Sequence, residues 1–185
     1  MLLTLLGAAA LLGHSAPARD TSATRTTVAT PTINRTPVVG INSAILADSI
    51  VVEKAKHTLT LFLGGFPMRS YQIALGKQPS GDKMRIGDGR TPEGLFHIDF
   101  RNPDSKYHMS LHISYPDAAH QERANALGVR AGGDIMIHGL PPAYASIGAL
   151  HRTYDWTEGC IAVTNAEIEE IWRAVPNGAP IQIKP

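Results

Sequence analysis

The residues best suited to chemistry in this chain are its single cysteine, Cys160, and a histidine that precedes it, His138. Cys160 follows a glycine in the segment Thr157-Glu158-Gly159-Cys160, and His138 stands between an apolar tripeptide and Gly139. A thiol and an imidazole have the parts of a nucleophile and its general base. The structural alternative is that a lone cysteine serves as a small buried hydrophobic residue, which is the commoner role of a free cysteine. The surrounding segments have to decide between these two interpretations.

A thiol nucleophile needs a base to take its proton and donors for the oxyanion that develops on the substrate. Gly159 allows a sharp turn beside Cys160, so the amides of both residues are candidate oxyanion donors. A capping box, Thr164 to Glu167, opens a predicted helix just downstream, and its positive end favours a thiolate. His138, at the end of a predicted strand, is the candidate base, and His112 is the next candidate.

A zinc site is the competing chemistry. His108 and His112 lie on one face of a predicted strand and could ligate zinc together with His138 and Cys160. Their spacing matches none of the common zinc patterns, so no metal and no organic cofactor is expected. The sequence favours structural or surface roles for the other histidines of the domain, which are His57, His97, His120 and His151.

Composition limits the class of protein. The chain has 185 residues, of which 43% are apolar and 18% charged, so a sizeable core is expected. The net charge is only +1, and no run of Lys and Arg could follow a phosphate backbone. We therefore expect no nucleic-acid partner.

The first residues predict export. Residues 1–12 are apolar and an Ala-x-Ala pattern ends at Ala18, so residues 1–18 are expected to be a signal peptide. The apolar run is too short to span a bilayer, so no membrane span is expected after cleavage. Residues 19–43 are rich in Thr, Ser and Pro and predict a flexible tether, followed by one domain over 44–185. The expected location is the periplasm or the cell wall, where a cysteine without a disulfide partner is retained either as an inert buried residue or for its reactivity.

The elements that must position these residues are mostly short strands, which predicts a mostly β (α+β) domain. A long segment with five glycines, 76–94, separates the first strands from the later ones and predicts an ordered functional loop or a plain surface connection. Apolar alternation and turn residues place strands at 49–53, 58–62, 69–75, 94–100, 109–113, 134–137 and 181–183, and helical patterns at 117–127, 142–151 and 165–173.

Three segments together resemble the L,D-transpeptidase catalytic domain, the YkuD-type fold of bacterial cell-wall enzymes. They are residues 76–94, with the core Gly-Asp-Gly-Arg-Thr-Pro-Glu-Gly, then 135–139, and then 157–160. The resemblance covers residues 49–184. The stretch 110–116 and the lead-in Gly-Gly-Asp before residue 135 look most like the branch that contains murein-release amidases.

The resemblance implies a β-sandwich-like fold with a few short helices, and acyl transfer on peptidoglycan stem peptides in cell-wall biogenesis and cell shape. Cys160 would attack the carbonyl of the third stem residue and release the terminal D-Ala, with His138 as base and the amides of Gly159 and Cys160 as oxyanion donors. The residues expected to contact substrate are Gly139, Thr157, Glu158 and His112.

The chain departs from the family pattern at three positions of the cysteine motif. Thr157 replaces a serine, Glu158 a histidine, and Ala162 an arginine. These departures leave open whether an amine or water resolves the thioester. The alternatives are therefore a cysteine hydrolase of the same fold, which trims stems or releases a wall-attached lipoprotein, and a non-catalytic wall-binding domain.

Overall fold

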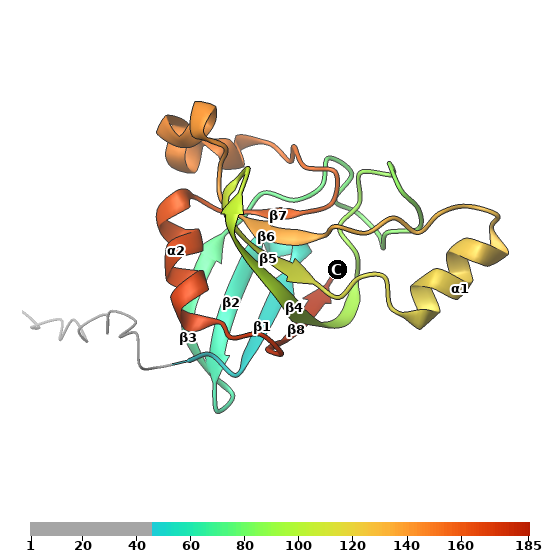
Figure 1. The fold of residues 1–185 in the computed structure, drawn as a ribbon, viewed down its shortest axis with the longest axis horizontal. Coiled ribbons are helices and arrows are strands. Elements are labelled where there is room, and N and C mark those ends of the chain that lie inside the picture. The colour runs from blue at the N-terminus through green and yellow to red at the C-terminus, as the bar shows by residue number, and fades with distance from the viewer. Residues whose placement is uncertain (1–45) are drawn as a thin grey trace, which may run out of the picture. The chain divides into compact units, whose positions relative to one another are not determined.

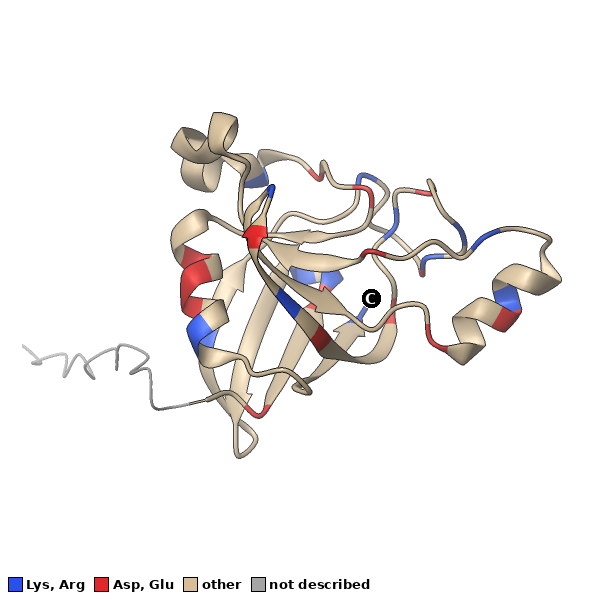
Figure 2. Ribbon diagram, in the orientation of Figure 1, with Lys and Arg blue, Asp and Glu red and all other residues tan. Residues whose placement is uncertain are grey.

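The computed structural model describes residues 46–185. The signal peptide expected at 1–18 and the tether expected at 19–43 lie outside the described residues, so both stay predictions. Within the described part of the chain, no helix is long and apolar enough to cross a membrane. Lysines and arginines are interleaved with acidic residues over strands, helices and loops (Figure 2).

Across residues 46–185, eight strands form one sheet in the order β3-β2-β1-β8-β4-β5-β6-β7 (Figure 1). Most neighbours are antiparallel, whereas β1 pairs with β8 and β6 with β7 in parallel. The strands are β1 (Ser49–Glu53), β2 (Thr58–Leu63), β3 (Phe66–Gln72), β4 (Gly94–Ser105), β5 (His108–Ile113), β6 (Met136–His138), β7 (Ile161–Ala162) and β8 (Pro180–Lys184).

The sheet is curled because β4 belongs to both of its halves. The start of β4, from Gly94 to His97, pairs with β8, and the remainder pairs with β5 through two irregularities in register. At the far end, Ala74 follows β3 and exchanges both backbone hydrogen bonds with Ala162 of β7, each 2.9 Å long. The two ends of the sheet therefore meet.

The core lies inside this curl. Alternate residues of β1 and β2 are buried, as period-2 patterning requires. Helix α2 (Asn165–Ala174) packs against β5 and β6 and buries Ile168, Ile171 and Ala174. The capping box predicted from Thr164 and Glu167 is present at its start. Helix α1 (Ala118–Ala126) begins at the N-cap Asp117 and projects from the sheet (Figure 1).

The predicted mostly β fold with a few short helices is confirmed, and the differences are local. Strand β3 begins at Phe66 and ends at Gln72, earlier than expected at both ends. The strand expected at 134–137 begins only at Met136, because Asp134 has a φ of 53° that interrupts the extended backbone. The helix expected at 142–151 is a 3₁₀ segment, η2 (Pro142–Thr153), interrupted at Gly148.

The glycine-rich loop 76–94 is held by buried polar contacts instead of regular structure. Lys54, in the short 3₁₀ turn η1 (Lys54–Lys56), is only 3% exposed. Its ammonium donates to the carbonyls of Gly81 (2.7 Å) and Thr91 (3.0 Å) and to the carboxylate of Glu93 (2.7 Å). The Asp88 carboxylate accepts from the loop's own amides at residues 84, 85 and 90. The loop is therefore an ordered part of the domain.

One side of this loop presses against the segment that carries the cysteine. A Cβ added to Gly76 would lie 2.2 Å from the carbonyl oxygen of Gly89 and 3.1 Å from the Cα of Gly159. Gly159 itself has a φ of 133°, and a Cβ there would lie 2.5 Å from the Arg90 carbonyl oxygen. Glycine is required at both positions because backbone meets backbone.

Gly76→Ala should therefore lower the free energy of unfolding by about 1–3 kcal/mol, the usual cost of overpacking. Urea unfolding measured by circular dichroism would test this. Gly133→Ala is the matched control, because the nearest atom to its added Cβ is 3.9 Å away. Equal stability of the two variants would contradict the close packing of loop and turn.

Candidate active site

The parallel pairing of β6 and β7 places His138 and Cys160 on one face of the sheet. Ile137 pairs with Ile161 and His138 with Ala162. Side chains alternate between the two faces of a strand, and continuing this alternation one residue beyond the start of β7 puts Cys160 on the face of His138. The two isoleucines point to the opposite face and are fully buried.

The two ring nitrogens of His138 differ, because among the described residues Nδ1 is hydrogen-bonded and Nε2 is not. Its Nδ1 lies 2.7 Å from the carbonyl oxygen of Gly139. A carbonyl only accepts hydrogen bonds, so Nδ1 carries the proton and Nε2 carries the lone pair. Within residues 46–185, Nε2 has no hydrogen-bond partner. The neutral ring is thus oriented as a base that can accept a proton.

The surroundings of His138 keep it neutral. Its ring centroid lies 4.4 Å from that of Tyr107 and 5.8 Å from that of Trp156, and its side chain is 3% exposed. This burial lowers the pKa of His138 to about 4. At neutral pH the imidazole is therefore in its base form.

Cys160 is a protonated thiol in this structure. Burial raises the pKa of the thiol, whereas the Met136 amide and the Lys83 ammonium lower it by smaller amounts. The thiol donates to the carbonyl oxygen of Asp134 over 3.4 Å. At neutral pH the raised pKa of Cys160 and the lowered pKa of His138 leave both groups neutral.

Thr157 stabilises the turn that carries Cys160. The sequence instead predicted that it would contact substrate. Its hydroxyl donates to the carbonyl of Cys160 (2.7 Å) and accepts from the amide of Gly159 (3.1 Å). The side chain is buried, so no polar atom is left for a substrate. The amide of Gly159 is likewise engaged and is not a free oxyanion donor. Among the described residues, the amides of Glu158 and Cys160 have no partner.

The other residues expected to contact substrate occupy varied positions. Glu158 is exposed and forms an ion pair with Lys77. A Cβ on Gly139 would lie 2.6 Å from Oδ1 of Asn165, so Gly139 packs against the start of α2 while its carbonyl orients His138. His112 shares the face of His138, since it pairs with Met136.

The residues considered for zinc are not assembled. His112 Nδ1 lies 2.6 Å from a carboxylate oxygen of Asp99 on β4, and His108 Nε2 lies 2.8 Å from Glu169 on α2. Over residues 46–185, no three His, Cys, Asp or Glu side chains are grouped to hold a metal ion. His108 and His112 are thus each paired with a carboxylate on another element.

Sequence reasoning missed Lys83. This lysine comes from the loop 76–94, is 3% exposed, and donates to Asp88 Oδ1 over 2.8 Å. It also donates to the carbonyls of Arg90 and Glu158, each at 3.4 Å, and so links the loop to the cysteine turn. The signal available in the sequence was a Gly-Asp-Lys triplet in a loop already singled out. Tyr107 and Trp156, which flank His138, were also missed.

A family model and a curated relative both match this chain as an L,D-transpeptidase. Residues 47–183 match the family model for the L,D-transpeptidase catalytic domain, YkuD. YafK of Escherichia coli (strain K12), provisionally named an L,D-transpeptidase, is 35% identical over 109 residues, which are 57% of this chain and 36% of that protein. The chain thus spans about a third of the length of the curated relatives it matches.

Two solved structures share the fold. The helical cell shape determining protein Pgp2 from Campylobacter jejuni superposes with a TM-score of 0.56 and 23% identity over 78% of this chain and 51% of that one. Bd1075 of Bdellovibrio bacteriovorus superposes with a TM-score of 0.52 and 22% sequence identity, over 78% of this chain and 50% of that one.

Lys83→Met should raise the pKa of the Cys160 thiol, because it removes the positive charge beside the turn. A rise of one pKa unit lowers the thiolate fraction at neutral pH about tenfold. Iodoacetamide alkylation rates measured from pH 6 to 10 would report this.

Lys54→Met is the matched control, because Lys54 is equally buried and anchors the same loop through two carbonyls and a carboxylate. It should leave the alkylation profile unchanged. Equal shifts in both variants would mean that Lys83 acts only through loop folding.

Stability should fall as pH decreases from about 6.5 to 5. Burial holds the pKa of His138 and of His151 at about 4, below the ordinary value of 6.5 in the unfolded chain. The unfolded state therefore binds more protons in this window, and stability is complete only above pH 6.5. Urea midpoints between pH 5 and 7.5 would test this, and His138→Gln should weaken the dependence without abolishing it, because His151 still contributes. A flat wild-type profile would contradict the burial of neutral histidines.

Proposed function

The chain belongs to the L,D-transpeptidase catalytic domain family, YkuD, and from this membership we propose that it transfers acyl groups of peptidoglycan stem peptides through a thioester on Cys160. The observation that carries the proposal is the β6–β7 pairing, which puts the free Nε2 face of His138 and the thiol on the same face of the sheet. Membership of the family supports the substrate class, and the β6–β7 pairing supports the choice of Cys160 and His138 as the reacting groups.

The protonation states define the first step. Both groups are neutral at rest, so His138 takes the thiol proton as the sulfur bonds to the carbonyl carbon of the third stem residue. The bond from that carbon to the nitrogen of the terminal D-Ala then breaks. His138 returns the proton to the leaving amine, and the acyl group stays on Cys160 as a thioester.

The oxyanion is best met by the amides of Glu158 and Cys160, which have no acceptor among the described residues. The Gly159 amide keeps the turn in shape through Thr157. Loss of one such donor typically costs about 2.7–4 kcal/mol of transition-state stabilisation. Lys83, which bonds the Glu158 carbonyl, holds the peptide group that precedes Gly159.

The second step needs an acceptor. In transpeptidation an amine of another stem attacks the thioester, and in hydrolysis water attacks it. The family favours the amine, and a wall-attached lipoprotein is a further candidate partner. Since one fold relative is named a cell-shape-determining protein, we extend the proposal to wall remodelling that affects cell shape. Peptidoglycan lies outside the cytoplasmic membrane, so this activity requires export to the periplasm or cell wall.

Intact-protein mass spectrometry with a purified disaccharide-tetrapeptide tests the proposal. The wild-type protein should gain the mass of the stem without D-Ala, and Cys160→Ala should gain nothing. An added acceptor stem should yield a cross-linked dimer. Release of free tripeptide alone would assign the hydrolase, and no adduct on any stem would overturn the thioester mechanism.

His138→Gln should slow acylation about 10²–10⁴-fold, as loss of a general base does. His112→Gln is the matched control, because His112 lies on the same face but is bonded to Asp99. Rapid-quench acylation rates would separate the two. A larger loss in His112→Gln than in His138→Gln would transfer the role of base to His112.

A further inference from the structure

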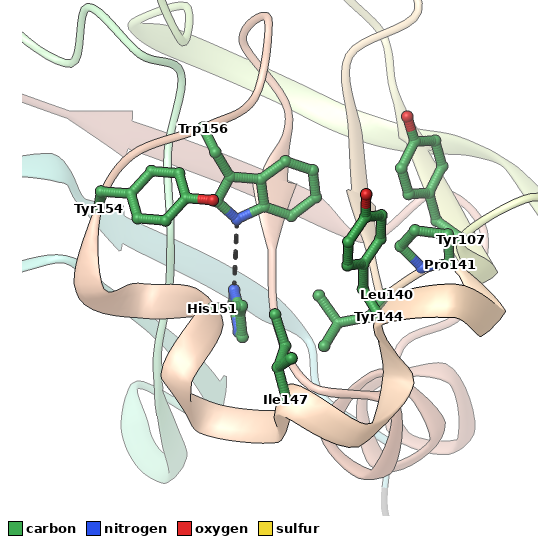
Figure 3. A pocket seen from close by; sticks show the side chains of 8 residues that line it. All are labelled: Tyr107, Leu140, Pro141, Tyr144, Ile147, His151, Tyr154 and Trp156. Atoms are coloured by element: carbon green, nitrogen blue, oxygen red, sulfur yellow. Dashed lines mark hydrogen bonds between the residues drawn. The ribbon is translucent and has the colours of Figure 1, made fainter.

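A cavity of about 390 Å³ lies beside the candidate active site (Figure 3). It is built mainly by η2 and its flanks, the segment between His138 and Cys160, together with the hairpin that joins β4 to β5. Its size falls at the lower end of the range for small-molecule sites, about 300–1,000 Å³. The lining residues are Tyr107, Leu140, Pro141, Tyr144, Ile147, His151, Tyr154 and Trp156.

The cavity shares two walls with the catalytic base. Tyr107 and Trp156 line it, and the same two rings lie against His138, with centroids 4.4 and 5.8 Å away. A molecule held there is therefore next to the reacting groups. It could belong to the same substrate that Cys160 attacks.

His151 supplies a hydrogen-bond donor without an acceptor. Its Nδ1 accepts from Nε1 of Trp156 over 3.5 Å (Figure 3), so Nε2 carries the proton. The side chain is 2% exposed, and Nε2 has no partner within residues 46–185. An unpaired buried donor is costly, and a ligand acceptor removes that cost.

The lining carries no charge. Seven of the eight described side chains that form it are apolar residues or uncharged aromatics, and burial holds the pKa of the eighth, His151, at about 4. Figure 2 shows no charged residue along η2 before its end. Carboxylates and ammonium groups lose their hydration here without a counter-charge, so the charged stem peptide is a poor occupant.

Aromatic faces favour a ring with an apolar side. Tyr144 and Tyr154 are 59% and 67% exposed at the rim, where large aromatic surfaces are otherwise unfavourable. The uncharged part of peptidoglycan is its glycan strand of N-acetylated sugars. A sugar ring can stack its C–H face on tyrosine or tryptophan, and its acetamide oxygen can accept from His151 Nε2 once the imidazole turns toward the cavity, because that atom is buried at rest.

We propose that this cavity binds an N-acetylated sugar ring of the glycan strand to which the stem peptide is attached. The inference rests on the proposed function for the identity of the polymer. It assigns the segment between His138 and Cys160 the task of selecting glycan-attached stems. His151 donates a hydrogen bond to the acetamide oxygen, and the rim tyrosines supply stacking surfaces.

Direct binding tests the cavity independently of catalysis. N,N′-diacetylchitobiose is titrated into Cys160→Ala protein while the indole N–H signal of Trp156 is followed by NMR. The signal should shift, and cellobiose, which lacks acetamide groups, should bind at least tenfold more weakly. His151→Phe should remove this discrimination. No shift with the acetylated sugar, or equal binding of the two sugars, would overturn the proposal.

Steady-state kinetics with two substrates provide a second test of the glycan site. The ratio of kcat/KM for disaccharide-tetrapeptide to that for free tetrapeptide should be about ten or more in the wild type and near one in Tyr154→Ala. Because it is a ratio, general losses of activity cancel. Phe66→Ala is the matched control, an exposed aromatic on β3 outside the cavity, and should keep the wild-type ratio.

The two proposals can fail separately. Turnover of both substrates at equal rates, with no sugar binding, would overturn the glycan site and leave the acyl transfer standing. Sugar binding by a protein that forms no thioester on any stem would support the cavity and overturn the proposed reaction.

Discussion

The parallel pairing of β6 and β7 is the constraint on which the site depends. A slip of one residue in this register would turn Cys160 to the core face, away from the face that carries His138. Yet β7 contains only two residues, Ile161 and Ala162, too few to fix a register alone. The register is secured from the other side, where Ala74 exchanges both backbone hydrogen bonds with Ala162. Closing the curled sheet therefore also positions the thiol.

The second support is the loop 76–94, whose backbone lies directly against the cysteine turn. Contact this close requires glycine on both sides, at Gly76 and Gly159, and leaves carbonyl groups that need donors. Lys83 provides donors for two of them and is itself paired with Asp88. A buried ammonium is tolerated because every contact it makes is to an oxygen. The contacts of Lys83 thus order the long loop and hold the shape of the cysteine turn at the same time.

The sequence predicts what is local and misses what joins distant segments. Alternation in residues 58–62, the capping box at Thr164 and the histidine at the end of β6 were recognisable because each depends on near neighbours. The contact of Lys83 with Glu158 spans 75 residues and leaves no periodic trace. Thr157 was assigned to the substrate because its motif lies at the site, but its hydroxyl is consumed inside the turn. Such partners follow only from the closed fold.

The neutral resting state of Cys160 and His138 has a consequence for how readily the sulfur is chemically modified. Oxidants and simple electrophiles react with thiolates, and the raised pKa of Cys160 keeps its sulfur protonated at neutral pH. The only sulfhydryl of the chain is therefore slow to react with peroxide and with stray disulfides. Under the proposed thioester mechanism, a covalent inhibitor has to occupy the site as the stem peptide would before the sulfur becomes reactive, so shape complementarity, more than electrophile strength, governs its selectivity.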